Sequence, residues 1–200
     1  MQKRIAILGS TGSIGTQALE VISRHPDKFE VEVLTALNNV DLLIEQSIRY
    51  KPNVVVIGNE DHYNRVRSAL EKFPIKVYCG PDAIAQVTTF DSVDMVLTAM
   101  VGFSGLKPTI EAIRGGKNIA LANKETLVVA GELIMKEAEA KQVSIIPVDS
   151  EHSAIYQCLA GEGNNPIEKI ILTASGGPLS GLGKAGTGKG KSGSRKPITT

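Results

Sequence analysis

Short runs that are almost entirely apolar recur along the chain, and segments with helical periodicity lie between them. Runs such as VVVI, MVLTA and IIPV are typical of strands that are covered on both faces. We expect strands at Arg4–Leu8, Val31–Ala36, Val54–Ile57, Lys76–Cys79, Met95–Ala99, Asn118–Ala122, Ser144–Val148 and Lys169–Thr173. The helices that we expect between them include Thr16–Ser23, Leu42–Tyr50, His62–Phe73, Lys107–Arg114 and Gly131–Lys141.

This alternation predicts an α/β fold with a doubly wound parallel sheet, because strands joined through helices by short links form right-handed crossovers. Sheets of this kind bind their ligands beyond the carboxyl ends of the strands. The residues that directly follow each strand are therefore the first candidates for a functional site.

The composition narrows the classes of function. With 22 basic and 21 acidic residues the net charge is +1, which provides no general field to attract nucleic acid or an anionic membrane. Only 4% of the residues are aromatic and none is Trp, so few side chains are available to stack on bases. No apolar run reaches the roughly 18–20 residues that a membrane span needs. Two cysteines fit a reducing cytoplasm. We therefore predict a cytoplasmic protein that binds neither nucleic acid nor membranes.

A glycine-rich loop follows the first predicted strand directly. Gly9, Gly12 and Gly15 form the pattern G-x-x-G-x-x-G, a relative of the dinucleotide fingerprint G-x-G-x-x-G. The first glycine permits a tight turn, the second lets the backbone approach a pyrophosphate, and the third lets helix and strand pack closely. The amides and the positive end of the helix favour an anion there. The alternative is an ordinary turn between a strand and a helix.

The end of the second predicted strand bears on the choice of cofactor. A cofactor with a free ribose 2′-hydroxyl usually meets an acidic residue there. The segment Thr35–Asn39 contains no acid, which favours the phosphorylated cofactor NADP, although the segment also contains no Arg.

An acidic pair follows the strand predicted at Ser144–Val148. Asp149 and Glu151 supply carboxylates two residues apart, which suit a hard divalent cation such as Mg²⁺ or Mn²⁺. Ser150 between them is able to donate to a bound oxyanion. The alternative makes Asp149 or Ser150 the N-cap of a following helix, with Glu151 favoured by the helix dipole. The residues alone do not decide between these two interpretations.

Two further strand ends carry candidate groups. Lys124, within Asn123-Lys124-Glu125, is placed to pair with a phosphate or carboxylate of a ligand, or else begins a solvated helix. The small residues around Ser175 permit the close approach of an anion, or else form a simple turn.

Taken together, five segments resemble one family, 1-deoxy-D-xylulose 5-phosphate reductoisomerase of the non-mevalonate isoprenoid pathway. They are ILGSTGSIGTQALEVI at 7–22, AMVGFSGLKPTIEAI at 99–113, IALANKETLVVAGELI at 119–134, IIPVDSEHSAIYQCL at 145–159 and ILTASGGP at 171–178. The resemblance implies an NADPH- and divalent-metal-dependent oxidoreductase and isomerase. Its reaction converts 1-deoxy-D-xylulose 5-phosphate to 2-C-methyl-D-erythritol 4-phosphate. Alternatives are an NADP-binding fragment without catalysis and another NADP-dependent dehydrogenase.

The resemblance also implies roles for individual residues. The cofactor-binding positions are Thr11, Gly12, Ser13, Ile14, Leu37, Asn38, Asn39, Asn123 and Glu125. Leu37 and Asn38 stand where the family usually carries a glycine and often a basic residue. The substrate, a small phosphosugar, would contact Lys124, Ser150, Glu151 and Ser175. Asp149 and Glu151 would bind Mg²⁺ or Mn²⁺, and with Lys124 they form the implied catalytic set.

The same resemblance implies a domain organisation. It places an NADPH-binding domain at residues 1–148 and the beginning of a catalytic domain at 149–178, and the family suggests a homodimer. Residues 179–200 contain six glycines, five basic residues and no acid, so we expect a disordered tail there. Because the resemblance ends near Pro178, in the middle of the implied catalytic domain, we expect a truncated chain with little or no turnover of its own.

Overall fold

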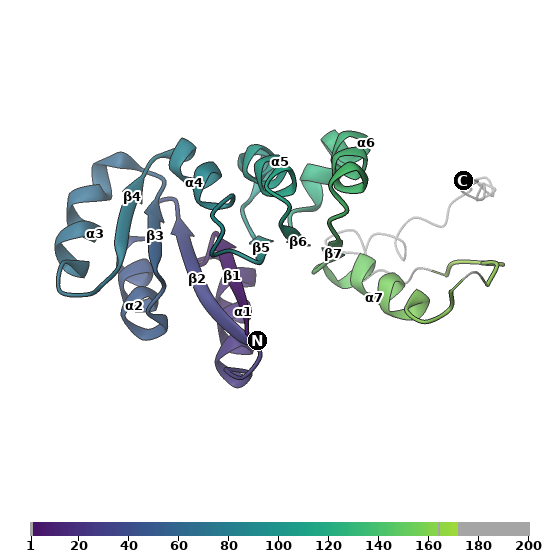
Figure 1. Ribbon diagram of the computed structural model, residues 1–200, viewed down its shortest axis with the longest axis horizontal. Helices are drawn as coiled ribbons and strands as arrows, with labels where there is room; N and C mark the ends of the chain where they lie inside the picture. Colours follow the sequence, from purple (N-terminus) through teal and green to yellow (C-terminus); the bar gives the residue numbers. More distant parts are fainter. Residues whose placement is uncertain (1, 164, 172–200) are drawn as a thin grey trace, which may run out of the picture. The chain divides into compact units, whose positions relative to one another are not determined.

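Seven parallel strands form one sheet in the computed structural model, which describes residues 2–163 and 165–171. The strand order is β4-β3-β2-β1-β5-β6-β7, so β1 lies at the centre with β2 on one side and β5 on the other. The strands are β1 (Lys3–Leu8), β2 (Phe29–Ala36), β3 (Val54–Ile57), β4 (Lys76–Cys79), β5 (Met95–Thr98), β6 (Asn118–Leu121) and β7 (Ile145–Pro147). The predicted doubly wound parallel sheet is confirmed (Figure 1).

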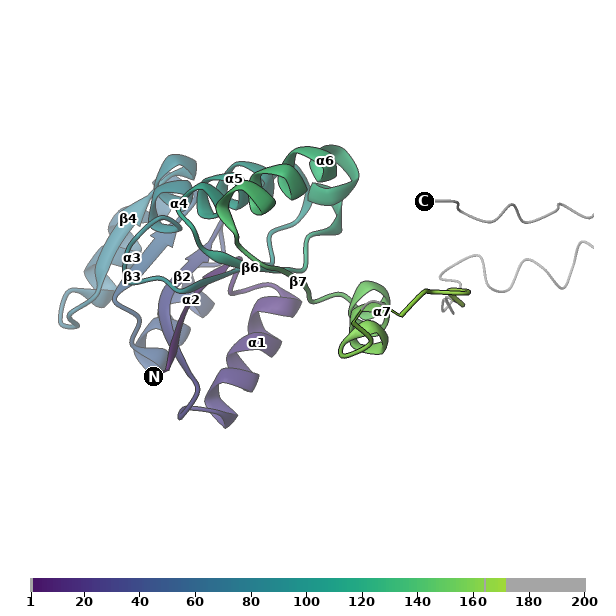
Figure 2. The same cartoon turned by 45° about the vertical axis from the view of Figure 1, so that its right-hand side comes forward.

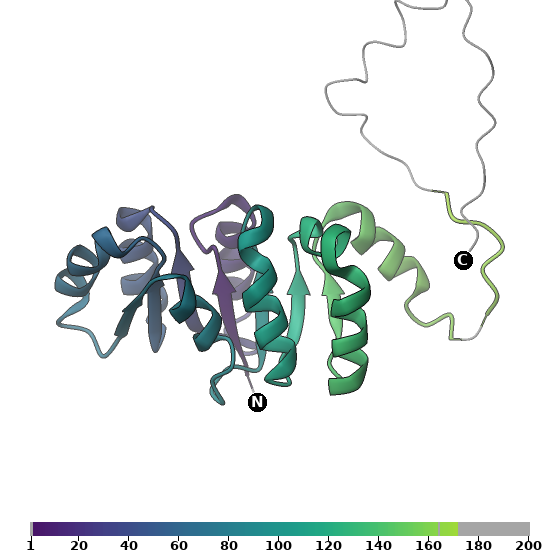
Figure 3. The same cartoon turned by 90° about the horizontal axis from the view of Figure 1, so that it is seen from above.

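Helices cover both faces of this sheet. They are α1 (Ser13–Arg24), α2 (Val40–Tyr50), α3 (Tyr63–Leu70), α4 (Pro81–Val87), α5 (Leu106–Arg114) and α6 (Lys124–Lys141). Helix α7 (Ser150–Leu159) follows β7, and short 3₁₀ turns η1 (Glu60–His62) and η2 (Gly102–Gly105) precede α3 and α5. Figure 2 shows α4, α5 and α6 on one face and α1 and α2 on the other. Figure 3 shows α5 packed beside α6.

The central strands are mostly apolar, although β2 also buries Glu32, because their side chains alternate between two buried cores. In β1, Ile5 and Ile7 pack on the face covered by α1, α2 and α3, while Ala6 and Leu8 pack on the face covered by α4, α5 and α6. Successive side chains of a strand point to opposite faces, so a strand covered on both sides favours apolar residues at adjacent positions.

The chain divides into two compact units, Met1–Ala160 and Gly161–Thr200. The first contains the sheet and its helices. In the second, the described residues 161–163 and 165–171 form turns and irregular backbone, with the Asn165 amide donating to the Glu162 carbonyl at 3.1 Å.

The structure corrects several predicted boundaries. The helix predicted at Gly131–Lys141 begins seven residues earlier, at Lys124, and contains a kink at Ala130. The strand predicted at Lys169–Thr173 is wrong over residues 169–171, which have irregular backbone; residues 172 and 173 lie outside the described part. Helix α4 was not among the predicted helices, because it is only seven residues long and begins at Pro81. The predicted disorder of residues 179–200 also lies outside the described residues.

An ion pair joins β1 to the loop that precedes β5. The Arg4 guanidinium donates to both oxygens of the Asp94 carboxylate, from Nη2 at 2.8 Å and from Nε at 3.1 Å. The Arg4 backbone amide adds a third bond at 2.8 Å. These bonds from Arg4 outweigh the effect of partial burial and lower the pKa of Asp94 to about 2.

We expect Asp94→Asn to lower the free energy of unfolding at pH 7. A carboxyl whose pKa is depressed by folding stabilises the protein above its unfolded pKa, near 4, and loses that contribution as the pH falls through 2. The difference between wild type and variant should therefore shrink between about pH 4 and pH 2. Urea unfolding measured across this range tests it, and a difference that stays constant down to pH 2 would contradict it.

Candidate active site

The glycine loop after β1 is held in a conformation that requires glycine at two of its three positions. Gly9 has φ of +83°, and a Cβ atom there would lie 2.8 Å from the Ala99 carbonyl oxygen. A Cβ atom at Gly15 would lie 2.4 Å from the Gly9 carbonyl oxygen, which is much closer than van der Waals contact. These distances agree with the structural roles predicted for Gly9 and Gly15.

Gly12 differs from the other two glycines. It is exposed, has an ordinary φ of −79°, and a Cβ atom there would have its nearest neighbour at 3.4 Å. It is the N-cap of α1, and among the residues that the structure describes no side chain caps that helix. The first N–H groups of a helix have no partner within the helix, so this uncapped end can receive an anion. Thr11, Ser13 and Ile14, the predicted cofactor-binding neighbours of Gly12, adjoin this end, and their contact with a cofactor stays a prediction.

A buried polar cluster holds this loop from behind. The Ser10 hydroxyl donates to Gln46 Oε1 at 2.7 Å, and Gln46 Nε2 donates back to the Ser10 carbonyl at 3.0 Å. The Thr35 hydroxyl accepts from the Gly9 amide at 3.0 Å. This cluster was not identified from the sequence. The signal that could have indicated it is a polar residue, Gln46, on the apolar face of the α2 helix. Its bonds fix the loop to β2 and α2.

The predicted residues after β2 lie at the surface. Leu37 is 62% exposed, and its side chain lies over Gly58. Asn38 Oδ1 accepts from Asn59 Nδ2 at 3.1 Å. Asn39 caps α2, its Oδ1 accepting from the Leu42 amide at 3.3 Å. The amide side chains therefore have structural partners here, and Leu37 exposes an apolar surface beyond the end of β2.

Asn123 joins the end of β6 to the loop after β5. Its buried side chain donates from Nδ2 to the carbonyls of Met100 and Gly102, each at 2.7 Å, and accepts from the Thr126 amide at 3.2 Å as the N-cap of α6. Asn123, which was predicted to contact the cofactor, thus has a structural role: its side chain links the end of β6 to the loop after β5. Lys124 and Glu125 follow in the first turn of α6, and both are exposed.

Replacing Asn123 by alanine should destabilise the domain by about 2 kcal/mol, since two partly buried carbonyls lose their donor and α6 loses its cap. Asn123→Asp separates these effects, because aspartate keeps the capping oxygen and lacks the donor. We expect both variants to unfold at lower urea concentration than wild type. Wild-type stability in Asn123→Asp would show that the bonds to Met100 and Gly102 contribute nothing.

Asp149 is the N-cap of α7, so the capping interpretation of the acidic pair is correct for this residue. Its Oδ1 accepts from the His152 amide at 2.9 Å, and the His152 ring lies 2.8 Å from Oδ2. Burial raises the pKa of the Asp149 carboxyl, but the hydrogen bonds from His152 outweigh this, and the net pKa lies below its ordinary value. The carboxylate is therefore held in its charged form, which is also the form that binds a cation.

Glu151 projects from the first turn of α7, and the Ser150 hydroxyl donates to its Oε2 at 3.1 Å. Within residues 2–163 and 165–171, no group of three or more His, Cys, Asp and Glu side chains is placed to hold a metal ion. The described part of the chain thus supplies a pair of carboxylates. Ser175, the predicted phosphate ligand, lies outside the described residues.

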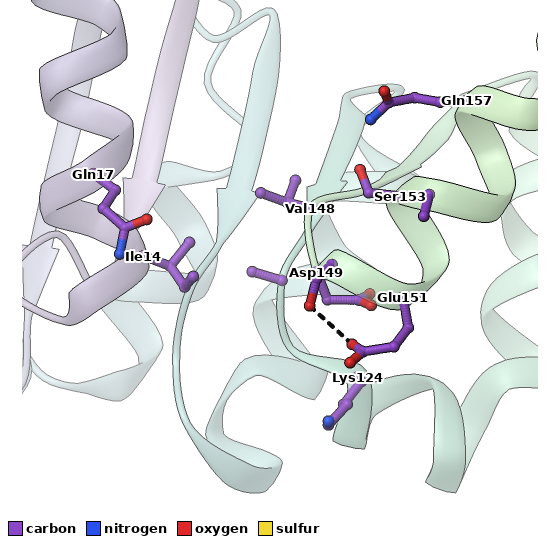
Figure 4. A pocket seen from close by; sticks show the side chains of 11 residues that line it. Ile14, Gln17, Lys124, Val148, Asp149, Glu151, Ser153 and Gln157 are labelled. Carbon is purple, nitrogen blue, oxygen red and sulfur yellow. Dashed lines mark hydrogen bonds between the residues drawn. The ribbon is translucent and has the colours of Figure 1, made fainter. Parts of the chain in front are cut away.

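A cavity of about 780 Å³ brings these elements together. Ile14 and Gln17 of α1 line one side, and Lys124, Asp149 and Glu151 line the other (Figure 4). Ala122, Val148, Ser150, Ser153, Ala154 and Gln157 complete the lining. The cavity therefore places the end of the glycine loop opposite a lysine and two carboxylates. Within the described part of the chain, no helix combines the length and the apolar character that crossing a bilayer requires.

The sequence profile of 1-deoxy-D-xylulose 5-phosphate reductoisomerase matches residues 5–131. The chain belongs to this family. The profile of the C-terminal domain of 1-deoxy-D-xylulose 5-phosphate reductoisomerase matches residues 145–188, which extends past Pro178. The reductoisomerase of Bacteroides thetaiotaomicron is 65% identical over 178 residues, which are 89% of this chain and 46% of the relative. The chain thus spans about half the length of the curated reductoisomerases that it matches.

Solved reductoisomerases have the same fold. The enzyme from Zymomonas mobilis in complex with NADPH superposes with a TM-score of 0.85 at 38% identity, covering 92% of this chain and 49% of that one. A reductoisomerase in complex with NADPH, fosmidomycin and magnesium gives a TM-score of 0.77 at 36% identity, covering 80% of this chain and 40% of that one. NADPH and magnesium are therefore ligands of solved members of the family.

Proposed function

We propose that this chain forms the NADPH-binding part, and a portion of the metal and substrate site, of a 1-deoxy-D-xylulose 5-phosphate reductoisomerase. The observation that carries the proposal is the shared cavity, in which Ile14 of the glycine loop faces Lys124, Asp149 and Glu151. A reductoisomerase needs its cofactor, its metal and its phosphosugar in one enclosure, since hydride transfer requires the reacting atoms to be held together.

The loop and the uncapped end of α1 fit a dinucleotide. The exposed Gly12 leaves the backbone open to a pyrophosphate, while Ser10, Thr35 and Gln46 keep the loop rigid. Thr11, Ser13 and Ile14 then hold the phosphates, with Leu37, Asn38 and Asn39 at the adenosine end and Asn123 and Glu125 near the end of β6. NADPH, when bound, supplies the hydride that reduces the rearranged carbon skeleton.

The acidic pair fits a hard divalent cation, Mg²⁺ or Mn²⁺, because both carboxylates supply oxygen ligands. A bound cation polarises the oxygens of the substrate. Lys124 is exposed at the start of α6 and lines the same cavity, so it is placed to pair with an anionic group of the phosphosugar. Ser150 donates to Glu151 and keeps that carboxylate oriented. Ser175 completes the proposed phosphate contacts.

We propose that this activity takes place in the cytoplasm. The two free cysteines, Cys79 and Cys158, support a reducing cytoplasm. We also propose that the protein acts as a homodimer in isoprenoid biosynthesis, as its family membership suggests.

The experiment is a fluorescence titration of the purified chain with NADPH, with NADH measured alongside. We expect saturable binding that is tighter for NADPH. Addition of 1-deoxy-D-xylulose 5-phosphate and Mn²⁺ then tests turnover: NADPH oxidation that needs both additions would overturn our expectation that this chain turns over little or not at all. Absence of NADPH binding would contradict the proposed function itself.

A further inference from the structure

The loops that follow β2 and β3 form one continuous surface. The Gly58 amide donates to the Ala36 carbonyl at 2.8 Å, and the Asn59 amide donates to the Leu37 carbonyl at 3.0 Å. The Asn59 side chain adds its bond to Asn38. These bonds continue the pairing of the two strands past their ends, so whatever binds beyond β2 also lies near the residues that follow β3.

Helix α3 begins within this surface and brings a cation to it. Arg65 lies in the first turn of α3, and its Nη2 pairs with Oδ1 of Asp41 in the first turn of α2. Asp41 is two residues after Asn39, and α2 packs beside α3. The segment Thr35–Asn39 contains no Arg, but the fold supplies one from 26 residues farther along the chain.

We propose that Arg65 binds the 2′-phosphate of NADPH and so sets the preference for NADPH over NADH. The inference rests on the proposed function, which places the adenosine ribose beyond the end of β2. In dinucleotide-binding folds a nearby arginine accommodates the 2′-phosphate at this position. The planar guanidinium matches the geometry of a phosphate and forms two parallel hydrogen bonds with it.

The existing partner of Arg65 does not prevent this. The side chains of Arg65 and Asp41 are 59% and 79% exposed, and ion pairs between such exposed groups contribute little. A phosphate carries more negative charge than a carboxylate, so it competes well for the guanidinium. Asp41 in the first turn of α2, and Glu60 and Asp61 in η1, carry negative charge near this surface and oppose the phosphate. Arg65 supplies a positive charge that offsets this repulsion.

The test measures dissociation constants of NADPH and NADH for wild type, Arg65→Met, Asp41→Asn and Arg67→Met. Methionine is a good helix former, so neither arginine replacement should disturb α3. Arg67 is the matched control, because it lies two residues away on the same helix and lines a separate cleft with Phe73 and Ile75. We expect Arg65→Met to weaken NADPH binding by about tenfold to a hundredfold, the usual range for losing a charge-assisted contact, with NADH unchanged.

We expect Asp41→Asn to change the affinity for NADPH in the opposite direction. Removing this carboxylate frees Arg65 and removes a repulsion, so NADPH should bind about threefold to tenfold more tightly at low salt, with NADH little changed. If Arg65→Met leaves NADPH binding unchanged, or weakens NADPH and NADH equally, the assignment of Arg65 is wrong while the proposed function stands. If wild type binds neither cofactor, the proposed function fails and the assignment of Arg65 fails with it.

Discussion

Replacing Gly15 by alanine should destabilise the domain and abolish measurable NADPH binding, whereas the same change at Gly12 should weaken NADPH binding in a folded protein. A Cβ atom at Gly15 would meet backbone atoms of Gly9 and Ser10 at 2.4 to 2.7 Å, and backbone cannot move aside as a flexible side chain can. Such overpacking typically costs about 1–3 kcal/mol, and here it also displaces the phosphate loop.

At Gly12 an added methyl group meets no protein atom closer than 3.4 Å. The free energy of unfolding should therefore change by less than about 1 kcal/mol, which includes the poorer capping by alanine. The methyl group instead occupies the space through which a pyrophosphate approaches the backbone. We expect the dissociation constant of NADPH to rise by about tenfold or more, the equivalent of roughly 1.4 kcal/mol.

Urea unfolding and NADPH titration of the two variants separate these effects. Gly131→Ala is the matched control, since a Cβ atom there has only the Leu127 side chain within 4 Å, at 3.9 Å. It should bind NADPH as wild type does. A stable Gly15→Ala variant with unchanged NADPH affinity would contradict the role that the structure gives to this glycine.

The second large effect is expected at the acidic pair. Glu151→Gln should weaken Mn²⁺ binding by at least about tenfold to a hundredfold, the range found even for residues that only orient a metal ligand. The free energy of unfolding should hardly change, because within the described residues Glu151 accepts a single hydrogen bond, from Ser150. Calorimetric titration with Mn²⁺ measures the loss, and Glu139→Gln on the exposed side of α6 serves as a control.

Asp149 needs a pair of variants because it both caps α7 and is proposed to bind the metal. Asp149→Asn keeps a good capping oxygen and removes the charge, so it should lose Mn²⁺ binding while losing less stability than Asp149→Ala, because it gives up only the charged interaction with His152. Asp149→Ala should lose Mn²⁺ binding and also about 1 kcal/mol of stability. If Asp149→Asn binds Mn²⁺ like wild type, Asp149 is a helix cap and nothing more.

The sheet could be predicted from the sequence because strands covered on both faces form short runs that are mostly apolar. The glycine loop was equally clear from its spacing, and the structure leaves no room for a Cβ atom at Gly9 or Gly15. The start of α6 was missed because its first turn carries polar residues, and only the structure shows that Asn123 caps it. The acidic pair stayed ambiguous because carboxylates at a helix start serve equally well as cap and as metal ligand.

Contacts between segments that lie far apart in the chain could not be predicted from the sequence. Gln46 supports Ser10 across 36 residues, and Arg65 reaches Asp41 from a different helix. A search for a cation confined to the segment after the second strand could not find Arg65. Such pairs depend on how strand order and helix packing bring elements together, which local patterns do not encode.

The central claim is that the cofactor loop and the acidic pair serve one site, and paramagnetic relaxation by Mn²⁺ tests it most directly. Proton resonances of NADPH bound to the chain are recorded with and without Mn²⁺, for wild type and for Glu151→Gln. In wild type, Mn²⁺ should broaden the nicotinamide protons more strongly than the adenine protons, and Glu151→Gln should remove this difference. Equal broadening of both ends, or a pattern unchanged in Glu151→Gln, would show that the metal does not bind beside the nicotinamide at the acidic pair.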